Sequence, residues 1–164
     1  MRRGLMLILA ALAAVPAGCG GPILRGAGGA GPAADQVTLW AAPLAEDADG
    51  RSGTDGVSVR LIFYDVAPGG KTEAVVVRQG VDLAMYEGDL RGRRLDDAEP
   101  FHVWQVTGEQ LAAFRSAYYG LRCYALTLYW PGHRPASGTV TLVARYQNEN
   151  GRLLQSQPAV IRIR

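Results

Sequence analysis

The chain has 164 residues and a formal net charge of +2. Its first two basic residues, Arg2 and Arg3, lie in a predicted export signal, and without them fifteen basic residues balance fifteen acidic ones. A near-neutral protein lacks the basic surface that nucleic-acid binding requires, and it has no polybasic attraction to a membrane. We therefore expect no nucleic-acid partner.

The first eighteen residues have the pattern of a signal peptide. Arg2 and Arg3 precede an uninterrupted apolar run of eleven residues, Leu5 to Val15. This run suits a signal-peptide core and is too short to span a bilayer, which takes about 20 apolar residues. We predict a signal peptide over residues 1–18 and export of the remaining chain.

The end of this signal carries a cysteine, Cys19. The segment Val15-Pro16-Ala17-Gly18-Cys19 resembles the lipobox of bacterial lipoproteins, in which the cysteine thiol receives diacylglycerol and becomes the new N-terminus. Pro16 departs from that pattern, which usually has an aliphatic residue there. The resemblance implies a membrane partner through lipid on Cys19, in the outer membrane or on the periplasmic face. The alternative is cleavage after Ala17, which would release a soluble secreted or periplasmic protein.

The segment after Cys19 is rich in Gly, Ala and Pro up to residue 34. Such a composition behaves as a flexible tether, so we expect residues 19–34 to link the lipidated cysteine to one domain over 35–164. Glycines at 26, 28 and 31 match the dinucleotide-binding spacing, but no strand precedes them and no helical period follows. We expect no cofactor.

Short apolar segments bounded by turn residues fill the predicted domain. The clearest lies at 57–64, where odd-numbered apolar residues alternate with Ser58 and Arg60. The pattern predicts a hairpin of 74–78 and 81–87 through Gln79-Gly80, and a central strand at 121–130 covered on both faces. The expected strands are 37–42, 57–64, 74–78, 81–87, 101–106, 121–130, 139–146, 152–156 and 160–164.

One helical segment interrupts the strands. Thr107-Gly108-Glu109-Gln110 fits a capping box, in which the Thr and Gln side chains each bind the other residue's backbone amide. The spacing of Leu111, Phe114 and Tyr118 predicts a short helix over about 108–118, closed by Gly120. Many short strands with one helix predict an all-β fold, an immunoglobulin-like antiparallel β-sandwich.

Three stretches carry a family resemblance: 56–64, the aromatic strand that runs into 107–111, and 157–163. They resemble bacterial lipoproteins of unknown function that carry one immunoglobulin-like or fibronectin-like domain behind a lipobox. We expect a protein or glycan partner in the cell envelope, and the resemblance implies a β-sandwich there. It implies no catalytic residues.

The remaining reactive side chains are scattered. His102 lies in a strand, and His133 lies in a loop without further ligands at metal spacing, so we expect no metal site. The acidic residues at 47 and 49 match a calcium loop only in part, because a cation, Arg51, occupies the next ligand position. Cys123 lies in an apolar strand and is expected to be a small buried hydrophobe. We expect no catalytic residues and no enzyme activity.

Seven aromatic residues lie within the 27 residues from Trp104 to Trp130. They either fill the sandwich core or form an exposed platform for a sugar ring or a partner. In the platform interpretation, the stacking residues are Tyr119, Tyr129 and Trp130. The sequence thus predicts an exported, lipid-anchored binding or scaffold module that is not an enzyme. The alternatives are a carbohydrate-binding module and a soluble secreted protein.

Overall fold

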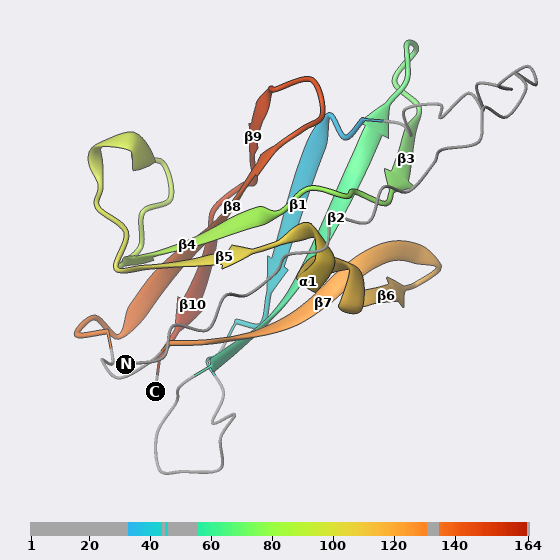
Figure 1. The fold of residues 1–164 in the computed structure, drawn as a ribbon. Helices are drawn as coiled ribbons and strands as arrows, with labels where there is room; N and C mark the ends of the chain where they lie inside the picture. Colours follow the sequence, from blue (N-terminus) through green and yellow to red (C-terminus); the bar gives the residue numbers. More distant parts are fainter. Residues whose placement is uncertain (1–32, 44, 46–55, 131–134, 164) are drawn as a thin grey trace, which may run out of the picture.

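Two antiparallel β-sheets pack face to face around an apolar interior (Figure 1). The computed structural model describes residues 33–43, 45, 56–130 and 135–163. Sheet A has the strand order β1 (Gln36–Ala41), β2 (Gly56–Val66), β7 (Leu121–Tyr129) and β6 (Arg115–Tyr118), with β3 (Thr72–Val75) paired to β2. Sheet B has the order β10 (Ala159–Arg162), β8 (Thr139–Gln147), β4 (Val81–Glu87) and β5 (His102–Val106), with β9 (Leu153–Gln155) paired to β8. The predicted all-β sandwich is confirmed.

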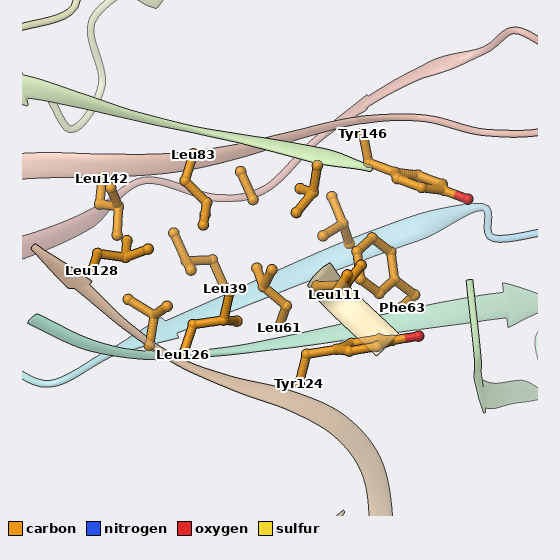
Figure 2. Packing of buried hydrophobic residues seen from close by; sticks show 14 of the residues in the cluster. Leu39, Leu61, Phe63, Leu83, Leu111, Tyr124, Leu126, Leu128, Leu142 and Tyr146 are labelled. Carbon is orange, nitrogen blue, oxygen red and sulfur yellow. The ribbon is translucent and has the colours of Figure 1, made fainter. Parts of the chain in front are cut away.

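The core follows from the alternation of side chains along each strand, because successive residues point to opposite faces of a sheet. On β2 the odd-numbered residues Val57 to Phe63 are buried between the sheets. The Phe63 ring contacts Tyr124 of the same sheet and Tyr146 of the facing sheet, with centroids 5.7 and 4.8 Å apart (Figure 2). Phe63 therefore packs between the two layers and contacts both of them.

The predicted hairpin of 74–78 and 81–87 is wrong. β3 pairs with β2 in sheet A, whereas β4 lies between β8 and β5 in sheet B, so the chain crosses from one sheet to the other between them. Val77, buried in this crossing, has a strand-like apolar position but no strand partner. The Tyr124 hydroxyl replaces that partner, since it accepts from the Val77 amide at 3.0 Å and donates to the Val77 carbonyl at 3.2 Å.

Two glycines allow the crossing to lie against the start of the helix. A Cβ atom on Gly108 would lie 1.8 Å from the Arg78 carbonyl oxygen, and one on Gly80 would lie 2.6 Å from the Val106 carbonyl oxygen. Side chains at either position would therefore collide with backbone. This close approach joins the segment between β3 and β4 to the end of β5.

The predicted helix begins correctly and ends too late. The capping box of α1 (Gly108–Ala113) is confirmed, with Gln110 N donating to Thr107 Oγ1 at 3.2 Å and Thr107 N donating to Gln110 Oε1 at 2.9 Å. The helix ends at Ala113, and the following residues form β6 instead. They pair with β7 through a two-residue turn, whose tight geometry draws 115–118 into the sheet.

β7 is buried along its inner face, but its outer face is covered only around Cys123 and Ala125, so the prediction of a strand buried on both faces is only partly right. Its residues Tyr124, Leu126 and Leu128 point into the core, while Thr127 and Tyr129 on the opposite face are exposed. The outer face of sheet A meets solvent at this position, as one face of many antiparallel sheets does. Cys123 is buried, as predicted.

The last strand is broken by a bulge. β9 and β10 both pair with the same edge of β8, but three residues, Ser156 to Pro158, oppose only Val143 and Ala144. The extra residue shifts the side-chain alternation, so that Leu154 and Ile161 both point into the core. The Ser156 hydroxyl accepts from the Ala144 amide at 3.0 Å and so restores the hydrogen bond that the bulge interrupts.

Candidate ligand groove between β5, α1 and β7

The two sides of the sandwich are closed in different ways. On the side of β1 and β10, the Arg162 amide donates to the Pro43 carbonyl and the Arg162 carbonyl accepts from the Ala45 amide, both at 2.9 Å. On the other side, the edge strands β5 and β6 are not paired with each other, and α1 links them (Figure 1). The helix covers only part of this side, because Leu111 is its one buried residue.

A groove of about 370 Å³ lies on this open side. Its floor is apolar, with Leu126 and Leu128 buried and Trp104 and Val106 partly buried. Amide and hydroxyl groups stand beside the floor, and the exposed Phe114 ring forms part of the wall. Each of the three elements supplies three residues: Trp104, Gln105 and Val106 from β5, Gln110, Ala113 and Phe114 from α1 and its C-cap, and Leu126, Thr127 and Leu128 from β7.

Trp104 fixes the geometry at one end of the groove. Its indole Nε1 donates to the Tyr129 backbone carbonyl at 2.7 Å, which ties β5 of sheet B to β7 of sheet A. The His102 ring meets the Trp104 ring edge-on at a centroid distance of 4.6 Å. A hydrogen bond and a ring contact therefore hold the indole in place at this end of the groove.

The side chains that line the groove can bind a ligand through apolar contacts and hydrogen bonds, but they include no acid, base or nucleophile of the usual catalytic types. Among the nine lining residues, all of which the structure describes, no side chain is ionisable. An apolar floor with a few amide and hydroxyl groups is the usual composition of a binding pocket. The groove therefore suits an apolar group flanked by hydrogen-bonding groups.

The groups whose pKa departs from its ordinary value lie outside the groove. Burial, followed by the nearby Glu149 carboxylate, raises the pKa of the Tyr146 hydroxyl well above its usual range. In the loop after β4, hydrogen bonds from Arg91 lower the pKa of Asp89 to about 2, and both side chains are exposed. Both shifts follow from local packing and pairing rather than from converging catalytic groups.

A second hollow, of about 360 Å³, lies beside the loop between β4 and β5. Two carboxylates, Glu87 and Glu99, are among its lining residues. Glu87 already accepts from the Ala136 amide at 2.8 Å. Among the described residues, no three His, Cys, Asp or Glu side chains come close enough to hold a metal ion.

The three predicted stacking residues do not lie together. Tyr119 is at the tip of the β6–β7 hairpin and 89% exposed, whereas Tyr129 is at the opposite end of β7 and 50% exposed. At about 3.3 Å per residue, the strand holds them roughly 30 Å apart. Trp130 is only 6% exposed and belongs to the core, so its ring is not available for stacking. The prediction that these three residues form one stacking platform is therefore wrong.

The core alternative for the aromatic residues is also only partly right. Trp104 packs against the core and Tyr124 is buried in it, but Phe114 is 42% exposed and Tyr118 lies on the outer face of sheet A. There Tyr118 contacts Trp40 and Arg60, which are far away in the sequence. Such a cluster has no local sequence signal, because its members come from three strands.

Several predicted features lie outside the described residues. They include the lipidation site Cys19, the proposed signal and most of the tether, His133, and the acidic pair at 47 and 49. Within the part of the chain that the structure does describe, no helix is long and apolar enough to cross a bilayer.

No protein-family model, curated protein or solved structure matches the chain. The functional proposals therefore depend on the residues and geometry of this protein.

Proposed function

We propose that this is an exported, lipid-anchored protein of the bacterial cell envelope, with a non-catalytic β-sandwich that binds an extended segment of a partner protein. The observation that carries the binding part is the apolar groove beside the unpaired edge of β5. β4 is the one described strand that pairs with β5, so the other edge of β5 has no strand partner. Three consecutive β5 residues line the groove, which therefore runs along that edge.

An extended peptide fits both the unpaired edge of β5 and the apolar groove beside it. Its main chain would pair with the free edge of β5, and every second side chain would enter the groove. The apolar floor favours aliphatic or aromatic side chains, and the amides of Gln105 and Gln110 can bind polar groups at the rim. A protein partner in the envelope is the ligand that this geometry supports best.

Export and anchoring are supported by the order of segments along the chain. A basic pair, an apolar run of eleven residues, an Ala-Gly-Cys sequence and a Gly/Ala-rich stretch precede the first described residue, Ala33. Ala34 is already buried, and its carbonyl accepts from the Asn148 side chain at 3.0 Å. The packed domain therefore starts about where the expected tether ends. Stable attachment requires more than one acyl chain on the lipidated N-terminus.

We further propose that the sandwich is of the immunoglobulin-like type, and the strand order supports this. Sheet A follows the A-B-E-D order of immunoglobulin constant domains, and sheet B follows G-F-C with one further strand, β5, in the place of C′. The connections between the sheets also agree, because β3 and β4 belong to different sheets, as do β7 and β8. The disulfide between the sheets that is typical of antibody domains has no counterpart among the described residues, where Cys123 is free.

Filling the groove should weaken peptide binding. We expect a random peptide library, selected on the immobilised full chain, to yield extended peptides with alternating apolar residues. Ala113→Trp puts a large ring into the groove and should weaken their binding at least about tenfold, or ~1.4 kcal/mol. The matched control is Ala67→Trp, at an exposed alanine in the turn after β2, which should bind like wild type. Equal binding by the Ala113→Trp protein, or no enriched peptides, would show that the groove is not a peptide site.

The anchor is tested by intact-mass analysis of the protein from cell envelopes. We expect the wild-type protein to lack residues 1–18, to carry the added mass of acyl chains and to fractionate with membranes. Cys19→Ala should remove the added mass and the membrane association, because it removes the acylated thiol. An unmodified mass and a soluble location for both proteins would contradict the anchor and favour the soluble secreted alternative.

A further inference from the structure

The outer face of sheet A carries a continuous group of aromatic rings and one guanidinium, which we call the outer platform: Trp40, Arg60, Tyr118 and Tyr119. The Tyr118 ring is at the centre. It meets Trp40 edge-on at a centroid distance of 5.3 Å and Tyr119 at 4.5 Å, and the Arg60 guanidinium lies 4.5 Å from its centroid. The group joins β1, β2 and the β6–β7 hairpin.

Two rings of this platform, those of Trp40 and Tyr119, remain accessible, whereas the central Tyr118 ring is half-buried. Trp40 is 41% exposed and Tyr119 is the most exposed of the large hydrophobic residues described, while Arg60 is exposed beside them. Large aromatic side chains normally find burial or a partner. Here the rings are ordered by their contacts with each other and with Arg60, but they leave surface free for a ligand.

Tyr119 is an unusual residue for its backbone position. It has φ of 48° and Gly120 has φ of 79°, so both central residues of the two-residue hairpin turn are left-handed. Such turns strongly favour Asn-Gly or Asp-Gly, and a bulky residue with positive φ is a rare and strained choice. The backbone is therefore strained at a position whose side chain is an exposed aromatic ring. Because such strain is often found at functional sites, it points to a role for the Tyr119 ring in binding.

The surroundings of the platform are polar. A shallow hollow of about 160 Å³ adjoins it, with Arg60 shared between hollow and platform. Ser58 and Thr127 supply hydroxyl groups to the lining of this hollow. On β1, Gln36 and Thr38 share the outer face with Trp40, because alternate residues of a strand point the same way.

We propose that the outer platform and its hollow bind a glycan. A pyranose ring has an apolar face of C–H groups that can lie on an aromatic ring, and hydroxyl groups at its edge that bind guanidinium and hydroxyl groups. The surface offers this combination: edge-to-face rings beside Arg60, with the Thr127 hydroxyl in the adjoining hollow. A protein interface would instead need a larger contiguous apolar surface around the rings, of about 800 Å² per partner.

This proposal goes beyond the peptide groove. The platform shares no residue with the groove lining and lies on the outer face of sheet A rather than beside the edge of β5, although the adjoining hollow shares Leu126 and Thr127 with that lining. The platform also differs from the sequence-based stacking group, from which it retains only Tyr119.

The test uses the purified full chain on an array of neutral and acidic bacterial and plant oligosaccharides, followed by titration with each oligosaccharide that binds. The main variant is Tyr119→Asn, because Asn is favoured in this turn and the hairpin should keep or gain thermal stability. Arg60→Met removes the guanidinium but keeps a long side chain. Tyr129→Asn, at an exposed tyrosine on the other end of β7, is the matched control.

We expect the wild-type protein to bind one class of oligosaccharide, and Tyr119→Asn and Arg60→Met each to weaken it at least about tenfold, or ~1.4 kcal/mol. Tyr129→Asn and the groove variant Ala113→Trp should bind as wild type does. The proposal is wrong if no oligosaccharide binds, or if the affinity is unchanged in both platform variants. Binding of a non-glycosylated protein that the same two substitutions abolish would also overturn it, in favour of a protein interface.

Discussion

Phe63→Ala is expected to lower the free energy of unfolding by about 3–5 kcal/mol, the range for removing a large aromatic side chain from a core. Phe63 is fully buried and contacts Tyr124 in its own sheet and Tyr146 in the facing sheet (Figure 2). Removal of the ring leaves a cavity between the layers and deletes two edge-to-face contacts. Because small domains are stable by only about 5–15 kcal/mol, this one change removes a large share of the total.

Chemical denaturation with urea, followed by tryptophan fluorescence, measures this effect. Val66→Ala is the matched control, since Val66 is on the same strand but exposed, and it should change stability by no more than about 0.5 kcal/mol. Similar losses for the two variants would contradict the burial of Phe63 between the two sheets.

Gly108→Ala is expected to cost about 3 kcal/mol, at the upper end of the range for overpacking. The added Cβ atom would lie 1.8 Å from the Arg78 carbonyl oxygen and 2.9 Å from the Arg78 carbonyl carbon, both of them backbone atoms that cannot rotate away. Either α1 or the crossing between β3 and β4 must move. A shift of α1 also displaces Gln110 and Ala113, so peptide binding in the groove should weaken together with stability.

Thermal unfolding compared with Gly138→Ala tests this prediction. Gly138 has open space around its Cβ position, and alanine there should have almost no effect. Wild-type stability in Gly108→Ala would mean that the helix does not lie against the crossing segment in solution.

Local pattern predicted most of the strands, because alternation reports which face of a strand is buried. β2, β4, β5, β8 and the Asn148–Gly151 turn agree with their sequence signals. The capping box also agrees, since all of its groups lie within four consecutive residues. The error at β6 arose because Leu111, Phe114 and Tyr118 have helical spacing, although only Leu111 of the three is buried.

The candidate sites are harder to predict from the sequence than the strands are. The sequence indicates Tyr119 as a stacking residue, but its neighbours Trp40 and Arg60 in the outer platform are more than fifty residues away along the chain. Trp130 has a side chain that is well suited to stacking on a ligand, but it is part of the core. The groove is formed by short pieces of β5, α1 and β7, none of which has a motif of its own.

The sequence by itself determined the strand-rich fold, the start of α1 and the balance of charge, since these depend on composition and on neighbours a few residues apart. Only the tertiary structure decided that β3 and β4 belong to different sheets, that a bulge at Ser156–Pro158 reverses the alternation of the last strand, and which aromatic rings face solvent. The physical reason is that strand pairing and side-chain burial depend on distant partners. The same alternating strand can pair with its neighbour in sequence or cross to the facing sheet, and packing of the whole domain selects between the two.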